Sequence, residues 1–155
     1  MARVSPRLLV LELGATGAET DRSAELSKIE FHSTPSEAEF TSFEEARAGG
    51  ARDYTAQLTM TQDHAASSLW TTIFDNAGTT LNGVYNPYGP TVTEPSVAQP
   101  FYGIRAIVSE PDGLLMGGEA TNSQRAVASI EVEWELEGKP EKLESLADLT
   151  AWTTP

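Results

Sequence analysis

The most regular pattern in the chain is the alternation of apolar and polar residues between Arg125 and Pro140, RAVASIEVEWELEGKP. Strand side chains point alternately to opposite faces. A helix would scatter the glutamates around its circumference, so the two-residue period predicts a long strand with one buried and one acidic face. Gly138 and Pro140 are expected to end it. The predicted inward residues are Ala126, Ala128, Ile130, Val132, Trp134 and Leu136, and the predicted outward residues are Val127, Ser129, Glu131, Glu133, Glu135 and Glu137.

Shorter alternating segments predict further strands. In the segment 25–33, Ile29 and Phe31 share one face, opposite Lys28, Glu30 and His32. The segment 37–46 fits either a helical turn or a bulged strand, and we interpret it as a strand. The other expected strands are 8–13, 54–60, 81–85 and 101–108.

A single convincing helix is predicted, over residues 63–76. Ala66, Leu69, Trp70, Ile73 and Phe74 recur at helical spacing. Asp63 is the expected N-cap, and the Asn76-Ala77-Gly78 sequence supplies a stop. The helix is amphipathic, so we expect it to cover an open face or end of the β-structure. Residues 142–148 are expected to form a short helix or a loose tail.

These elements together predict a mainly β fold, an antiparallel β-sandwich or barrel with one flanking α-helix. The 155 residues suit one domain. We expect the segments 1–25 and 141–155 to be extended or assembly arms of that domain. The chain has no Cys, so disulfides and thiolate chemistry are excluded.

The net charge of −13 disfavours ordinary nucleic-acid binding, which depends on Lys and Arg. The same charge suits a conduit through which a polyanion slides without sticking, or it simply keeps the protein soluble. No segment approaches the roughly 20 apolar residues of a membrane span, and the apolar run after Leu8 is too short for a signal peptide. The expectation is a soluble protein synthesised in the cytoplasm, without membrane association.

Catalytic signatures are missing from the sequence. His32 and His64 are far apart and are interpreted as surface or cap residues. There is no GxSxG elbow, phosphate-binding glycine loop or HExxH pair, so no catalytic, cofactor or metal site is predicted. Paired glutamates on a strand could serve glycoside hydrolysis, but such acids normally come from different elements of a cleft. The glutamate row is therefore interpreted as a solvated face or as a specialised negatively charged surface.

Several modest motifs, in order, resemble a known family. They are FTSFEEARAGGARDYTAQLTMTQDHAASSLWTTIFDNAG, then Pro100-Phe101-Tyr102-Gly103, Met116-Gly117-Gly118, and a Trp134 strand ending in Gly138-Lys139-Pro140. This succession resembles the major tail protein, or tail tube protein, of long-tailed bacteriophages that infect actinobacteria. The resemblance covers residues 26 to 140 and does not extend to the first 25 residues or the segment after Pro140.

The resemblance implies a structural virion protein of the phage tail. Its subunits would form hexameric rings that stack into a tube, with their inner sheets joined around a negatively charged lumen through which DNA is ejected. Implied partners are further copies of the chain and the tape measure, tail terminator and baseplate proteins. A tail completion protein, a head decoration protein and a small-ligand-binding β-barrel are the alternatives.

Two groups of residues follow as candidates. Glu131, Glu133, Glu135 and Glu137 are candidates for the lumen, where like charge would repel phosphates and keep DNA mobile; the other interpretation is that they face outer solvent. The loops 83–100 and 109–124 are candidates for contacts between rings or for ordinary loop packing. The candidate inter-subunit residues are Tyr85, Tyr88, Leu114, Leu115, Met116 and Trp152.

Overall fold

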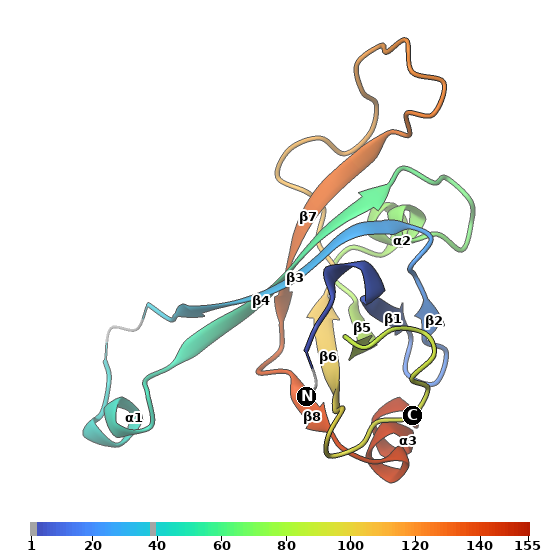
Figure 1. Ribbon diagram of the computed structural model, residues 1–155. Coiled ribbons are helices and arrows are strands. Elements are labelled where there is room, and N and C mark those ends of the chain that lie inside the picture. Colours follow the sequence, from blue (N-terminus) through green and yellow to red (C-terminus); the bar gives the residue numbers. More distant parts are fainter. Residues whose placement is uncertain (1–2, 38–39) are drawn as a thin grey trace.

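The computed structural model describes residues 3–37 and 40–155, and within them the chain is mainly β. Eight strands form one open antiparallel sheet in the order β2-β1-β5-β6-β7-β4-β3, with β8 also paired to β6 (Figure 1). The predicted mainly β, antiparallel character is confirmed. The strands are β1 Val10–Gly14, β2 Thr20–Asp21, β3 Leu26–Pro35, β4 Arg52–Thr61, β5 Thr80–Asn86, β6 Phe101–Ile107, β7 Ser129–Leu136 and β8 Glu141–Leu143.

Strand β7 has the predicted two-faced character. From Ser129 to Leu136 its residues alternate strictly between exposed and buried. The buried Trp134 also donates a hydrogen bond from its indole Nε1 to the carbonyl oxygen of Ser109 at 3.0 Å. The strand is shorter than predicted, because Ala126 and Ala128 are exposed and lie before its first residue. The apolar–polar alternation continues through these residues, but no core lies beside them, so their side chains stay exposed.

The main hydrophobic core contains residues from strands that are far apart in the sheet order. Leu11 and Leu13 of β1 belong to the same cluster as Leu58 of β4 and Trp134 of β7. Helix α2, Leu69–Asn76, adds Leu69, Trp70 and Ile73 to that cluster. The amphipathic helix therefore packs against the sheet, as its spacing predicts.

A second apolar cluster lies on the other side of β5 and β6. Val84, Phe101 and Leu143 form it, and the C-terminal helix α3, Leu146–Thr153, packs against it through Leu149 and Trp152. Gly103 is buried beneath the Trp152 ring, because a Cβ at this position would overlap the indole. Strand β6 is thus covered on both faces, whereas β7 is covered on one.

The β3–β4 hairpin extends away from the rest of the molecule and carries helix α1, Phe43–Arg47, at its end (Figure 1). Its strands remain paired from Ile29 opposite Leu58 to Pro35 opposite Arg52. Pro35 is the last residue of β3 and lies on an edge strand, where its missing N–H breaks no ladder bond.

The predicted start of the main helix is wrong. Helix α2 begins at Leu69, and the side chain of Ser68 caps it by accepting a hydrogen bond from the Thr71 amide at 3.2 Å. Asp63 accepts instead from the Ala65 amide at 3.0 Å and forms a separate turn. His64, expected in the first helical turn, precedes the helix and lies 4.0 Å from Trp70 between ring centroids.

Three further predictions are corrected. The segment 37–46, interpreted as a strand, begins helix α1 at Phe43 behind a Ser42 cap, while residues 38–39 lie outside the described residues. The described chain contains three α-helices and a short 3₁₀ helix, Pro6–Leu8, rather than one helix. Residues 141–155, expected as an arm, form β8 and α3 and pack on β6. Within 1–25, β1 is paired with β5 and is part of the core.

Candidate functional site

The acidic side of β7 continues across β4 and β3 as one polar face. The register places Glu131 of β7 beside Thr59 of β4, and Glu133 beside Gln57, with Lys28 and Glu30 of β3 one strand further along the same rows. In the third row, Glu135 lies beside Thr55, and His32 lies one strand further. Because residues directly opposite in antiparallel strands share a face, the three rows form a surface across three strands, which we call the acidic face.

The basic side chains of the acidic face, Lys28 and His32, contact Glu30 and not the β7 row. Lys28 Nζ lies 3.7 Å from Glu30 Oε2, and His32 Nε2 lies 3.0 Å from Glu30 Oε1. None of the ion pairs among the described residues involves Glu131, Glu133 or Glu135. The three side chains of β7 therefore face solvent without an ion-pair partner among the described residues.

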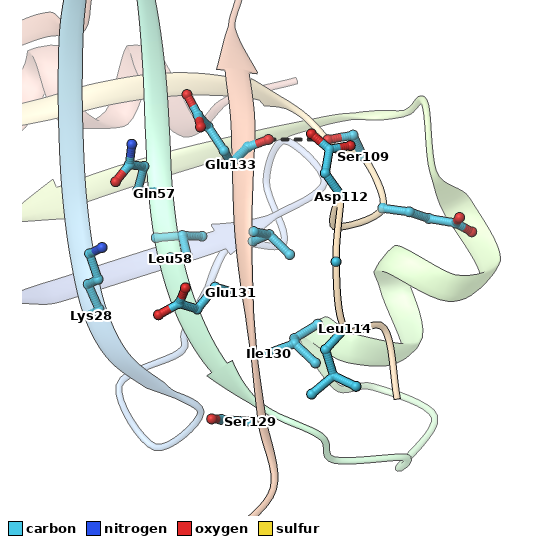
Figure 2. A pocket seen from close by; sticks show the side chains of 13 residues that line it. Lys28, Gln57, Leu58, Ser109, Asp112, Leu114, Ser129, Ile130, Glu131 and Glu133 are labelled. Carbon is cyan, nitrogen blue, oxygen red and sulfur yellow. Dashed lines mark hydrogen bonds between the residues drawn. The ribbon is translucent and has the colours of Figure 1, made fainter. Parts of the chain in front are cut away.

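A hollow of about 630 Å³ lies along this row (Figure 2). The segment after β6 forms its second wall, and Ser109 Oγ donates to the Glu133 carbonyl oxygen at 3.3 Å. Glu110 and Asp112 from this wall join Glu131 and Glu133 of β7, and Lys28 is the one cationic lining residue. Four carboxylates against one amine make the hollow repulsive to phosphates.

Glu137, the fourth candidate for the lumen, departs from the row. It follows the end of β7, where its amide donates to the Arg105 carbonyl at 3.0 Å and its carboxylate accepts from Thr80 Oγ1 at 3.2 Å. The acidic face consequently contains three of the four predicted glutamates.

The loop candidates Leu114, Leu115 and Met116 divide into two groups. Leu114 and Met116 are half-exposed in the loop between β6 and β7, which projects beyond the sheet (Figure 1). Leu115 packs against the core, and its carbonyl oxygen accepts from Trp70 Nε1 at 2.8 Å. Leu114 and Met116 remain candidates for contacts between copies, and Leu115 has a partner within its own chain.

The remaining contact candidates, Tyr85, Tyr88 and Trp152, lie in β5, in the turn after β5 and in α3. Tyr85 is in β5, so the predicted loop begins only after Asn86, and Tyr88 packs against the second apolar cluster. Trp152 is held inside its own chain, with Nε1 donating to the Gly83 carbonyl at 2.9 Å and Arg105 stacked 4.5 Å from its ring.

Tyr85 belongs to a hollow that the sequence analysis missed, which we call the aromatic groove. Its volume is about 320 Å³, and it lies where the β3–β4 hairpin leaves the body. Phe31 meets Tyr85 edge to face at 5.0 Å, and burial, followed by the nearby Tyr102 and Tyr88, raises the pKa of the Tyr85 phenol. The lining residues are Phe31, His32, Ser33, Tyr54, Tyr85, Tyr102, Ile104, Leu136, Lys139 and Pro140.

The end of the hairpin was also missed as a functional feature. Phe40 and Phe43 are 79% and 85% exposed, beside the acidic residues of α1. The sequence contains one sign of this exposure. Phe40 and Phe43 belong to no predicted apolar face of a strand or helix, so no core is predicted to bury them.

A cluster of carboxyl groups lies at the other side of the sheet. Glu12 is opposite Asp21, and burial, followed by the charges of Asp21 and Glu19, raises the pKa of the Glu12 carboxyl. Glu19 accepts a hydrogen bond from Asn82 Nδ2 at 2.7 Å, while Asn82 Oδ1 is buried without a partner. In the described part of the chain, no three histidine, aspartate or glutamate side chains are placed to hold a metal ion.

Comparison of the chain with protein-family models, curated proteins and solved structures finds no match. None of the helices in residues 3–37 and 40–155 is both long and apolar enough to cross a membrane.

Proposed function

We propose that this chain is a structural subunit of a phage tail tube, which assembles into stacked rings around a DNA conduit. The observation that carries the proposal is the acidic face, where the β7 glutamates have no ion-pair partner among the described residues. A surface that must let DNA pass without binding it requires negative charge that its own cations do not cancel.

The free edge of the sheet supports self-assembly. Among the described strands, β3 ends the sheet, and its ten residues leave one row of backbone donors and acceptors unpaired. Long exposed edges pair readily with other chains unless they are covered. Pairing of β3 with a neighbouring copy would continue the acidic face around a ring and close the sheet into a sandwich or barrel at the level of the assembly.

The proposed assembly follows the family resemblance in its further features. The rings are hexameric, Glu131, Glu133 and Glu135 face the lumen, and Leu114 and Met116 contact the next ring. The tape measure, tail terminator and baseplate proteins are the partners, and the location is the virion.

Negative-stain electron microscopy of the purified chain at high concentration tests the proposal. Regular hollow tubes or stacked rings are the expected result. Isolated rings or surface trimers would favour a tail completion or head decoration protein instead. Monomers that persist at every concentration would reject assembly and leave a small-ligand-binding β protein as the alternative.

A further inference from the structure

The end of the β3–β4 hairpin exposes two aromatic side chains that belong to neither apolar cluster of the described residues. We call residues 40–51 the arm tip. Phe40 and Phe43 are the two most exposed of the large apolar residues described, at 79% and 85%. Apolar groups that gather in one exposed patch mark interaction surfaces, unlike apolar residues scattered singly.

The arm tip is held in a defined position. Below it, Arg52 Nε donates to Ser33 Oγ at 2.7 Å, and the Ser36 amide donates to the Ala51 carbonyl at 2.9 Å. Within it, Ser42 Oγ accepts from the Glu45 amide at 3.1 Å and caps α1. An element that is already ordered loses less conformational entropy when it binds.

The aromatic groove offers matching chemistry for the arm tip. Its exposed lining is almost entirely apolar and includes three tyrosines, Tyr54, Tyr85 and Tyr102, which offer aromatic contacts to an inserted ring. Its volume of about 320 Å³ is at the lower end of the range of pockets that enclose a ligand group.

The charges of the two surfaces are complementary. The groove lining contains the cationic Lys139 and no carboxylate, while the His32 ring contacts Glu30 on the acidic face. Four other surface hollows of this acidic chain each contain at least one carboxylate. The arm tip contains Glu44 and Glu45 against a single Arg47.

The arm tip cannot reach the groove of its own chain. Phe31 and Ser33 of the groove lie on β3, the same strand that carries the tip outward, and the ladder between them and the tip is continuous. The hairpin would have to break its own pairing to fold back. The occupant is therefore a second copy.

We propose that the arm tip of one copy inserts Phe40 and Phe43 into the aromatic groove of a second copy, with Glu44 and Glu45 facing Lys139. This contact deepens the proposed function and rests on it for self-association. It joins two different surfaces, so it is heterologous and passes from copy to copy into rings or open chains.

Site-directed cross-linking tests the contact, because the natural chain has no cysteine. A Thr41→Cys variant, which keeps both phenylalanines of the arm tip, is mixed with a Ser33→Cys variant under mild oxidation, and mixed disulfides are measured by mass spectrometry. The control partner is Val97→Cys, since Val97 is 76% exposed and lies outside the groove. At least tenfold more mixed disulfide with Ser33→Cys is expected, and equal yields would overturn the proposal.

Charge exchange gives a second test, read by sedimentation velocity. Lys139→Glu is expected to weaken association at least tenfold, and Glu44→Lys with Glu45→Lys in the same chain is expected to restore it. Lys142→Glu is the matched control, because Lys142 is exposed on β8 outside the groove lining. Loss of association with Lys142→Glu to the same degree, or absence of rescue, would contradict the proposed contact.

The two proposals fail in distinguishable ways. If Phe40→Ser with Phe43→Ser leaves tube yield unchanged, the arm contact is refuted and the tube remains. If wild-type protein never forms tubes but the cysteine variants cross-link selectively at position 33, the tube is refuted and the contact between copies remains.

Discussion

Glu12 is a single residue whose environment makes stability depend on pH. Its pKa is raised by burial first and then by Asp21 and Glu19, so the folded state favours the protonated carboxyl. The folded protein binds more protons than the unfolded chain between the ordinary pKa of 4.5 and the raised value. Stability therefore falls as pH rises through that interval and carries a constant cost above it.

Glu12→Gln is consequently expected to raise Tm at pH 7, with the advantage vanishing below pH of about 4. Thermal unfolding followed by circular dichroism at both pH values measures the change. Asp21→Asn should give a smaller increase, because it removes the second cause and leaves burial. A Tm difference that is independent of pH would contradict this account.

Gly103 is the second residue with a predicted effect. Any Cβ there overlaps the Trp152 ring, so Gly103→Ala must displace α3 and weaken the bond from Trp152 to Gly83. The expected loss is about 1–3 kcal/mol in urea unfolding. Gly113→Ala is the control, because nothing lies within 4 Å of its Cβ, and a change within about 0.5 kcal/mol is expected.

If the overlap is the cause, Gly103→Ala should cost much less in a Trp152→Ala background, since residues in contact are not additive. Equal costs in both backgrounds would assign the effect to the backbone of β6.

At the scale of elements, the structure and the sequence-based prediction differ in which residue caps α2. Ser68→Ala removes the bond to the Thr71 amide and should lower stability by about 1–2 kcal/mol. Asp63→Ala should cost less, because Asp63 caps only a turn before the helix. The comparison is made by urea unfolding, and a larger cost at Asp63 would support the longer helix predicted from sequence.

Much of each element could be predicted from residue patterns, because burial on one face leaves a periodic signal. Ile130, Val132 and Trp134 were assigned inward, and all three are buried. The start of α2 could not be predicted, because Asp63 and Ser68 are both good caps and the choice depends on where Leu69 meets the core.

The candidate site was predicted in part for a similar reason. Alternation places Glu131, Glu133 and Glu135 outward without any knowledge of other strands. The partners Lys28 and Gln57, and the aromatic groove, depend on pairings between segments far apart in the chain. Sequence periodicity contains no information on strand order, so these were not found.

At the scale of the whole molecule, the acidic face should govern the response to salt. Outward neighbours on a strand are about 7 Å apart, so like charges there repel and salt screens them. The test is a triple variant in which Glu131, Glu133 and Glu135 are replaced by Gln. In urea unfolding, the stability gained between low and high salt should be smaller for this variant than for wild type.

The control changes the same amount of charge at exposed glutamates outside the acidic face and the arm tip, with Glu94, Glu119 and Glu141 replaced by Gln. If the proposed tube forms, tubes of the first triple variant should also retain several-fold more short duplex DNA on pelleting at low salt. Equal retention by both triple variants would show that the acidic face has no special role.

The uneven pairing of β7 with its two neighbours determines which strands we expect to unfold together. β7 shares seven residue pairs with β4 but only two with β6, Ala106 with Leu136 and Ile107 with Glu135. The backbone ladder is therefore nearly interrupted there, and side-chain packing around Trp134 holds the two sides together. Amide hydrogen exchange should resolve two separately opening cooperative units, one of β3, β4 and β7 and the other of β1, β5 and β6. Trp134→Phe should speed exchange in both, whereas Ser33→Ala should affect the first alone.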